Sequence, residues 1–249
     1  MRPSFSALVR AVPRLLYLCL LILAAWLLYY SLSSPYFSVQ EIAVSGNRLL
    51  GAEQAREAAE ALGRNALLLR TDDIGRSLRR ISVVKMAEAS LALPGRLRLE
   101  ITERTPVVQW QVRGESFLVD REGVVFSREP LPIAVVLVRD VDGPRVEVGS
   151  RIDPGVLASV ENLEMALPQR AGIKPQLFDY SVRDGVMVPV EGGPRMIFGD
   201  ASDLDAKLAN LAAIRDYLNR TKARAEVIDV RFKGRPLYVL APPPLNRPR

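Results

Sequence analysis

The sequence predicts an α+β protein with one membrane-spanning helix followed by two folded modules outside the membrane. Three observations support this prediction: a charge-free apolar run near the N-terminus, a following segment of alternating strand and helix patterns, and a third segment dominated by strand patterns. The chain has 249 residues, of which 49% are apolar and 25% charged, as is typical of globular domains. It is long enough for one large domain or two small ones.

Composition excludes several classes of function. The chain has no histidine, and its one cysteine, Cys19, lies in the apolar run. Histidine-dependent catalytic triads, imidazole metal sites and a disulfide framework are therefore excluded. The net charge is +6, but Arg2, Arg10 and Arg14 precede the apolar run, so the remainder carries about +3 with both signs interspersed. We expect no nucleic-acid partner, no small-molecule substrate, no cofactor and no metal.

The first predicted element is a membrane helix at 15–34. Its first 18 residues carry no charge and span roughly 27 Å at 1.5 Å per residue, close to the hydrocarbon thickness of a bilayer. Basic residues lie only on its N-terminal side, so the positive-inside rule places residues 1–14 in the cytoplasm and the bulk of the chain outside. A cleaved signal peptide is the disfavoured alternative, because the apolar region is long and no clear cleavage site follows.

The first module is predicted at 36–105. A strand at 39–44 is followed by an alanine- and glutamate-rich helix that we expect to close at Gly63. A shorter helix has Thr71 as its expected N-cap, and two further strands flank the turn at Pro94-Gly95. The order β-α-α-β-β predicts a small sheet with two helices on one face.

This module also carries a modest cluster of basic residues. We interpret the cluster as a solvated helix face, because acidic residues dilute it; an acidic partner or a lipid headgroup is the alternative. The cluster consists of Arg64, Arg70, Arg76, Arg79, Arg80 and Lys85.

A proline marks the junction between the two modules. The alternation of apolar and polar residues from Leu97 onward indicates a half-buried strand, which Pro106 interrupts before the pattern resumes. Proline cannot donate to a sheet ladder and restricts the residue before it. We therefore predict a stiff interdomain hinge at Arg104, Thr105 and Pro106. The alternative is a proline at an edge-strand bulge inside one domain.

The second module is predicted at 106–241 and is β-rich. We expect a hairpin with Asp120–Gly123 at its tip and a short buried strand over 133–140. A meander of three strands should turn at Asp184-Gly185 and again at 191–193.

Two helices are expected in the second module. The first has Asp153 as N-cap and Pro154 at its first position, and should end before Pro168. The second covers about 203–220. We expect both apolar stripes to pack against a sheet and not to form a coiled coil. The stripes are Leu157, Val160, Leu163 and Leu167 in the first helix, and Leu204, Leu208, Leu211, Ile214 and Leu218 in the second.

No catalytic or metal-binding motif is recognisable. Asp200, Asp203 and Asp205 lack the glycine and terminal glutamate of a calcium loop, and we interpret them as residues that cap the second helix and complement the dipole at its N-terminus. The lysines lie in no motif for serine–lysine catalysis. The sequence therefore predicts a protein without enzyme activity; glutamate-only chemistry in a cell-wall hydrolase is the remaining alternative.

The last strand is predicted at the edge of its sheet. Val227–Phe232 and Leu237–Leu240 form an expected hairpin, and prolines stand at both ends of its second strand, as is typical of an edge position. The four residues of that strand, Leu237, Tyr238, Val239 and Leu240, are apolar and uncharged. Such an edge is either a liability or a docking site for a partner's strand. The proline-rich residues 242–249 are predicted to be a disordered tail.

These motifs resemble those of a known family. "FSVQEIAVSGN" directly after a membrane helix and a hairpin ending in "ITERTPV" are similar to the POTRA (polypeptide-transport-associated) module of the bacterial division proteins FtsQ and DivIB. "ERTPVVQW…FLVDREGVVF" and "KLANLAAIRDYL…EVIDVRF" are similar to the β-rich second domain of that family. The resemblance covers nearly the whole chain from Leu15 to Leu240. It implies a non-enzymatic divisome scaffold in the inner (plasma) membrane at the division septum.

The resemblance also implies partners and a site. In this family the small bitopic proteins FtsB (DivIC) and FtsL dock on the end of the β-domain, partly by adding a strand. Asp229, Arg231 and Phe232 match the family's Asp-x-Arg-aromatic strand, and 237–240 match its last strand.

Two interpretations of Arg231 stay open at this point. Its guanidinium could pair with acidic residues of a partner or with Asp229 inside the chain. Tyr238 is favoured as an amphipathic anchor at the interface. The alternative function for the whole chain is a POTRA-type polypeptide-binding module in secretion or envelope assembly.

Overall fold

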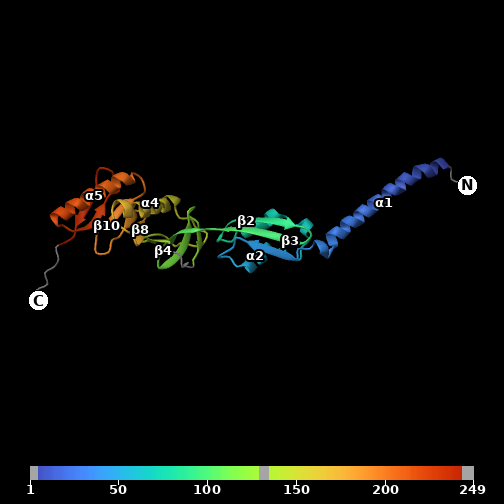
Figure 1. Ribbon diagram of the computed structural model, residues 1–249, viewed down its shortest axis with the longest axis horizontal. Coiled ribbons are helices and arrows are strands. Elements are labelled where there is room, and N and C mark those ends of the chain that lie inside the picture. Colours follow the sequence, from blue (N-terminus) through green and yellow to red (C-terminus); the bar gives the residue numbers. More distant parts are fainter. Residues whose placement is uncertain (1–4, 129–134, 243–249) are drawn as a thin grey trace. The chain divides into compact units, whose positions relative to one another are not determined.

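A computed structural model describes residues 5–128 and 135–242, with the backbone alone for residues 5–15 (Figure 1). The chain divides into two compact units, Met1–Glu103 and Arg104–Arg249. Most of the predicted proline-rich tail, from residue 243 on, lies outside the described residues, as does the start of the buried strand predicted over 133–140. The predicted α+β class, with an apolar N-terminal helix ahead of a small module and a β-rich module, is confirmed.

The first unit begins with α1, Phe5–Ser33. Its residues from Leu16 to Ser33 are apolar enough and numerous enough to cross a membrane, and none of them is buried inside the protein. The helix starts ten residues earlier than the predicted span, and a short 3₁₀ turn at Pro35–Phe37 follows it.

A three-stranded sheet forms the rest of the first unit. Its strand order is β1 (Glu41–Ser45), β3 (Arg96–Glu103) and β2 (Val84–Ala92), with β1 parallel and β2 antiparallel to the central β3. The predicted strands on either side of the Pro94-Gly95 turn are β2 and β3, and they pair with each other. Apolar residues lie opposite one another across this hairpin: Ala87 and Ile101, Ala89 and Leu99, and Leu91 and Leu97.

Two short helices, α2 (Ala52–Ala59) and α3 (Thr71–Leu78), pack on one face of this sheet. Two predicted helix ends are wrong. α2 ends four residues before Gly63, because Glu60 itself adopts the left-handed conformation at φ 46°. Thr71 is the first helical residue and not the N-cap, which is Arg70 and has no capping side chain.

The second unit contains a nine-stranded mixed sheet in the order β12-β11-β10-β9-β8-β7-β4-β5-β6. Parallel pairs join β4 to β7, β7 to β8 and β10 to β11, and the other neighbours are antiparallel. The strands are β4 (Pro106–Val112), β5 (Glu115–Asp120), β6 (Val125–Ser127), β7 (Val136–Asp140), β8 (Leu177–Ser181), β9 (Gly185–Val188), β10 (Arg195–Gly199), β11 (Ala225–Asp229) and β12 (Leu237–Leu240).

Helices α4 (Pro154–Arg170) and α5 (Leu204–Thr221) cover one face of this sheet, as Figure 1 shows. Their predicted stripes contribute the core residues, and Leu204 alone among them is only partly buried. The core also contains large aromatic side chains from the strands, including Trp110, Phe117, Phe178 and Phe198.

Two predictions in the second unit are corrected. A turn at Arg113-Gly114, both with positive φ, separates β4 from β5, so the chain makes two consecutive hairpins where one was expected. α4 runs through Pro168 to Arg170. Pro168 removes one intrahelical hydrogen bond and crowds the carbonyl of the preceding turn, and the helix ends two residues later.

Candidate partner-docking edge

The last strand, β12, lies at the edge of the nine-stranded sheet. It pairs in antiparallel fashion with β11, from Ala225 opposite Leu240 to Asp229 opposite Leu237. In the part of the chain that the structure describes, no strand pairs with its other side. The predicted edge position is therefore confirmed. An edge strand directs every second N–H and C=O group away from its sheet, where another chain can pair with it.

The side chains of β12 divide into two sets. Leu237, Val239 and Leu240 are 60%, 47% and 53% exposed, although all three are large and apolar. Tyr238 points to the helix side of the sheet, where it packs on the core and its ring lies 5.9 Å from that of Tyr217 in α5. Tyr238 thus holds the strand against the body of the unit, and its neighbours in the strand remain accessible.

The Asp-x-Arg-aromatic segment forms an ionic cluster inside the chain. Arg231 donates through Nη2 to Asp229 at 2.7 Å and through Nε to both carboxylate oxygens of Asp229, at 3.1 and 3.0 Å. Its Nη1 donates to Asp184 at 3.0 Å, in the turn between β8 and β9. These acidic neighbours, Asp229 foremost, raise the pKa of Arg231 against the opposing effect of its burial. Of the two interpretations of Arg231, these contacts support the ion pair with Asp229 inside the chain.

Phe232 lies beside this cluster and is exposed. The guanidinium carbon of Arg231 is 5.6 Å from the centre of the Phe232 ring, a cation–π contact. The ionic cluster therefore fixes the position of an exposed aromatic side chain just past β11.

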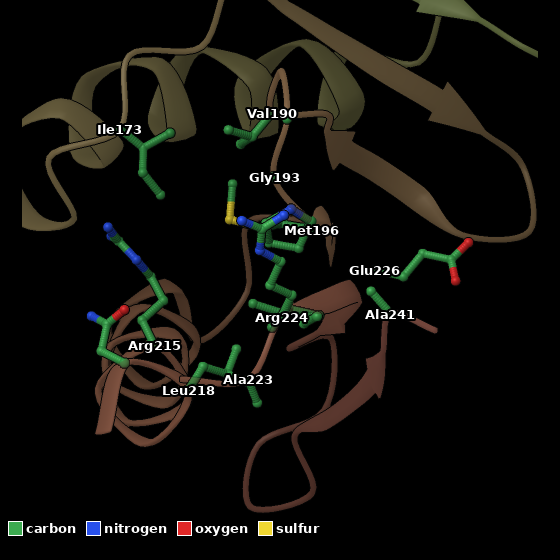
Figure 2. Close-up of a pocket in the computed structure, with 15 residues that line it drawn as sticks. Ile173, Val190, Gly193, Met196, Arg215, Leu218, Ala223, Arg224, Glu226 and Ala241 are labelled. Atoms are coloured by element: carbon green, nitrogen blue, oxygen red, sulfur yellow. The ribbon is translucent and has the colours of Figure 1, made fainter. Parts of the chain in front are cut away.

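A cavity of about 610 Å³ opens beside the end of β12 (Figure 2). Ala241, the residue after β12, lines it together with the C-terminal half of α5 and the start of β11. Met196 and Ile173 supply apolar wall, and the side chain of Arg224 reaches across the opening toward Met196. Sequence patterns gave no signal for this cavity, because its residues come from four separate segments.

The start of α5 is anchored by a buried lysine that sequence reasoning missed. Lys207 is almost fully buried, and its Nζ donates to the backbone oxygen of Asp200 at 2.9 Å and to its carboxylate at 2.8 Å. These contacts, with a hydrogen bond from Ser202, lower the pKa of Asp200 to about 2. Asp203 occupies the N-cap of α5, as predicted, but has a left-handed backbone and no side-chain capping hydrogen bond, and Asp205 lies in the first turn, where it complements the helix dipole. Asp200 instead binds Lys207.

The predicted hinge residues lie at the boundary of the two units. Glu103 accepts hydrogen bonds from the backbone of residues 48–50 in the first unit. Arg104 pairs with Asp120 and Glu122 in the second unit. Pro106 is the first residue of β4, which lies inside the second sheet between β5 and β7. The alternative is a proline at an edge-strand bulge inside one domain. The pairing of β4 with β5 does shift its register between Pro106 and Val108, but β4 is not an edge strand, and β3 and β4 belong to different sheets.

Comparison with known proteins agrees with this architecture. Residues 37–104 match the model of the POTRA domain, FtsQ-type, and residues 108–231 match that of the cell division protein FtsQ/DivIB, C-terminal. The chain is 33% identical over 189 residues to cell division protein FtsQ of Chloroflexus aggregans, covering 74% of this chain and 69% of that protein.

Two further relatives carry the same name. FtsQ of Chloroflexus aurantiacus is 30% identical over 193 residues, which cover 77% of this chain and 71% of the relative. FtsQ of Myxococcus fulvus is 28% identical over 224 residues, which cover 84% of this chain and 75% of the relative.

The described residues contain one helix that is long and apolar enough to cross a membrane, followed by a POTRA module and a β-rich domain, and this combination defines a class of POTRA protein with an apolar N-terminal helix. The chain belongs to the FtsQ/DivIB family of cell division proteins.

Proposed function

We propose that this chain is a non-enzymatic scaffold of the division machinery that receives a strand from small bitopic division proteins on β12. The FtsB/DivIC-like and FtsL-like proteins are the proposed partners. The observation that carries the proposal is an apolar, exposed edge strand that is paired on one side only in the described chain. Backbone pairing along such an edge supplies affinity, and the side chains beside it supply specificity.

Three exposed residues of β12 and one neighbour are the proposed contact residues. Leu237, Val239, Leu240 and Phe232 offer apolar surface that an added strand would remove from water. Three other residues support this surface through contacts inside the chain. Asp229 and Arg231 fix the end of β11, and Tyr238 holds β12 from the helix side of the sheet, where it packs on Tyr217. The cavity beside Ala241 gives room for side chains that follow the partner's strand.

The topology and location belong to the same proposal. α1 anchors the chain in the inner membrane, and the basic residues on its N-terminal side favour a cytoplasmic N-terminus. The POTRA domain at 36–105 and the β-domain at 106–241 then lie outside the cytoplasm at the septum, joined by the hinge at 104–106.

A proline substitution tests strand addition directly. Because Ala241 N donates to Arg224 O, the N–H of the preceding Leu240 points away from β11 by the alternation of an antiparallel strand. Leu240→Pro should therefore remove an outward donor and spare the native ladder. We expect at least tenfold weaker capture of purified FtsB-like partner by the full-length chain in detergent.

Leu240→Ala is the matched control, because it shortens the same side chain and keeps the N–H. It should retain capture to within a few-fold. Equal capture by the proline variant and the wild type, with unchanged thermal unfolding of both, would rule out strand addition at this position.

A further inference from the structure

The membrane-facing end of the first unit is tied to the end of α1. Asn65 donates through Nδ2 to the backbone oxygens of Ser31 at 3.1 Å and Leu32 at 2.7 Å. These carbonyls belong to the last turn of α1, which has no intrahelical partners for its final oxygens. Asn65 therefore lies at the depth where the apolar span ends, which is the interfacial region of a bilayer.

Large apolar side chains surround Asn65 and are exposed. Leu67 donates its backbone N–H to Asn65 Oδ1 at 2.9 Å, so its position follows that of Asn65. Leu62 and Leu68 lie on the same loop, and Tyr36 belongs to the 3₁₀ turn directly after α1. Each of these four side chains is at least 45% exposed, although apolar side chains of this size are usually buried.

The tip of the β2–β3 hairpin reaches the same end of the unit. Gly95 O accepts hydrogen bonds from the backbone of Gln40 and Glu41, only a few residues after α1. On the other side of this segment, Val39 N donates to Arg64 O at 2.9 Å. The exposed Leu93 at the hairpin tip therefore joins the leucines of the 62–68 loop around one short connection to the membrane helix.

We propose that this end of the POTRA module docks on the lipid surface, with its apolar side chains in the membrane interface. We call it the membrane-proximal face and define it as Tyr36, Leu62, Leu67, Leu68 and Leu93. Continuity with α1 identifies the occupant, because Asn65 is joined to carbonyls that a membrane-spanning helix holds at the bilayer surface. Apolar side chains at that depth leave water when they enter the boundary between headgroups and acyl chains.

Two arginines complete the chemistry of the membrane-proximal face. Arg64 and Arg70 flank Leu67 and Leu68 in the sequence, and both arginines are exposed. Among the described residues neither is in an ion pair, whereas Arg76 of the same predicted basic cluster pairs with Asp73. Unpaired guanidinium groups at the bilayer surface attract anionic lipid headgroups. The basic cluster thus divides into a lipid-facing part and a helix-surface part.

Spin labels at two matched leucines test this inference, which rests on α1 being a retained anchor. Leu67 and Leu49 are 45% and 41% exposed, but they lie toward opposite ends of β3. Leu49 N donates to Glu103 at the end of β3, whose eight residues span about 23 Å. Each leucine is replaced by cysteine in the full chain carrying Cys19→Ser, labelled, and reconstituted in phosphatidylcholine vesicles with or without phosphatidylglycerol.

We expect the label at 67 to be more accessible to membrane-soluble oxygen than to a water-soluble nickel chelate, and the label at 49 to show the reverse. Phosphatidylglycerol should increase the difference, because each arginine should raise the equilibrium constant for docking by roughly fivefold. Arg64→Gln with Arg70→Gln should abolish that increase.

Equal nickel accessibility at both positions, in vesicles that carry the protein, would overturn lipid docking. An unchanged phosphatidylglycerol effect in the double glutamine variant would overturn the role of the arginines. Failure of the chain to sediment with the vesicles would overturn the anchor and this inference together. Partner capture on β12 is measured on the same samples. Loss of capture would count against the docking edge alone, so that result is distinguishable from the other three.

Discussion

The two edges of the nine-stranded sheet are built in opposite ways. At one edge β6 has only three residues, and its Val125 and Phe126 are buried. Val125 also exchanges backbone hydrogen bonds with the neighbouring loop, donating to Ser150 O at 3.0 Å and accepting from Gly149 N at 2.7 Å. At the other edge, β12 presents three exposed apolar side chains, and no described strand covers it.

The comparison shows that this fold can protect an edge strand from stray pairing, and that it does so at β6 but not at β12. Short strands, covering loops and charges are the usual ways in which proteins prevent stray pairing. β6 uses the first two, whereas β12 is also short but carries no charge and is covered by no strand among the described residues. A sheet that protects one edge and leaves the other apolar is expected where the second edge receives a specific strand.

The largest expected effect is on stability, at the protected edge. Phe126→Ala should destabilise the second unit by about 3–5 kcal/mol, because it removes a fully buried ring. Urea unfolding of a chain lacking residues 1–34, followed by the fluorescence of buried Trp110, measures this loss. Capture of an FtsB-like partner at low temperature should be unaffected. Weaker capture in proportion to the lost stability would show that the two edges are not independent.

The second effect is on capture, at the exposed edge. Leu237→Glu combined with Val239→Glu should weaken partner binding by about 2–3 kcal/mol, or roughly 30- to 150-fold, because each carboxylate would be buried without a partner. Both side chains are already exposed, so the free energy of unfolding should change by no more than about 0.5 kcal/mol. Titration of labelled partner gives the first value and urea unfolding the second. Undiminished affinity would place the docking surface elsewhere.

The third effect is a loss of stability at low pH in the part of the second unit that contains α5, β11 and β12. The pKa of Asp200 is lowered to about 2, so its ion pair with Lys207 stabilises the folded state above the ordinary carboxyl pKa near 4. This stability should be lost as the pH falls from about 4 to about 2. Hydrogen exchange should then rise in α5 and β11–β12 before it rises in β5–β6.

Variants of the same pair sharpen this prediction. Asp200→Ala should cost about 1–2 kcal/mol at neutral pH, a value reduced from that of a buried pair because the carboxylate itself is exposed. Lys207→Met with Asp200→Ala should recover most of the loss, since no buried charge remains. An acid transition in the double variant identical to that of the wild type would assign the pH dependence to other carboxylates.

The smallest expected effect is at the ring pair that supports β12. Tyr217→Leu removes the aromatic contact with Tyr238 and should cost about 1 kcal/mol of stability. Because β12 would then be held less firmly, partner capture should also weaken a few-fold, which thermal unfolding and binding titration measure in parallel. Unchanged capture would show that Tyr238 is fixed by its backbone pairing alone.

Elements with a strong period were predictable from the sequence. The stripes of α4 and α5 and the paired apolar residues of the β2–β3 hairpin are local repeats that directly report which face is buried. The edge position of β12 followed from the prolines at its ends. Together with the motif resemblance, these features predict the α+β fold class from the sequence alone.

Features that depend on one unusual backbone conformation were not predictable. Arg113 and Glu60 both adopt positive φ, which the sequence usually signals with glycine or asparagine. The Asp229–Arg231–Asp184 cluster and the Asp200–Lys207 pair depend on residues brought together by folding. The sequence showed the charges but not their partners, so two interpretations of Arg231 stayed open.

The hydrogen bonds from Asn65 to two carbonyls of α1 have a consequence for rotation of the helix. Successive residues of a helix are offset by about 100° around its axis, so bonds to two successive carbonyls fix the rotation of α1 relative to Asn65 as well as its position along the axis. Turning α1 about its long axis must therefore turn the three-stranded sheet with it. A neighbouring helix that packs against one face of α1 inside the bilayer would therefore fix the direction in which the POTRA module faces.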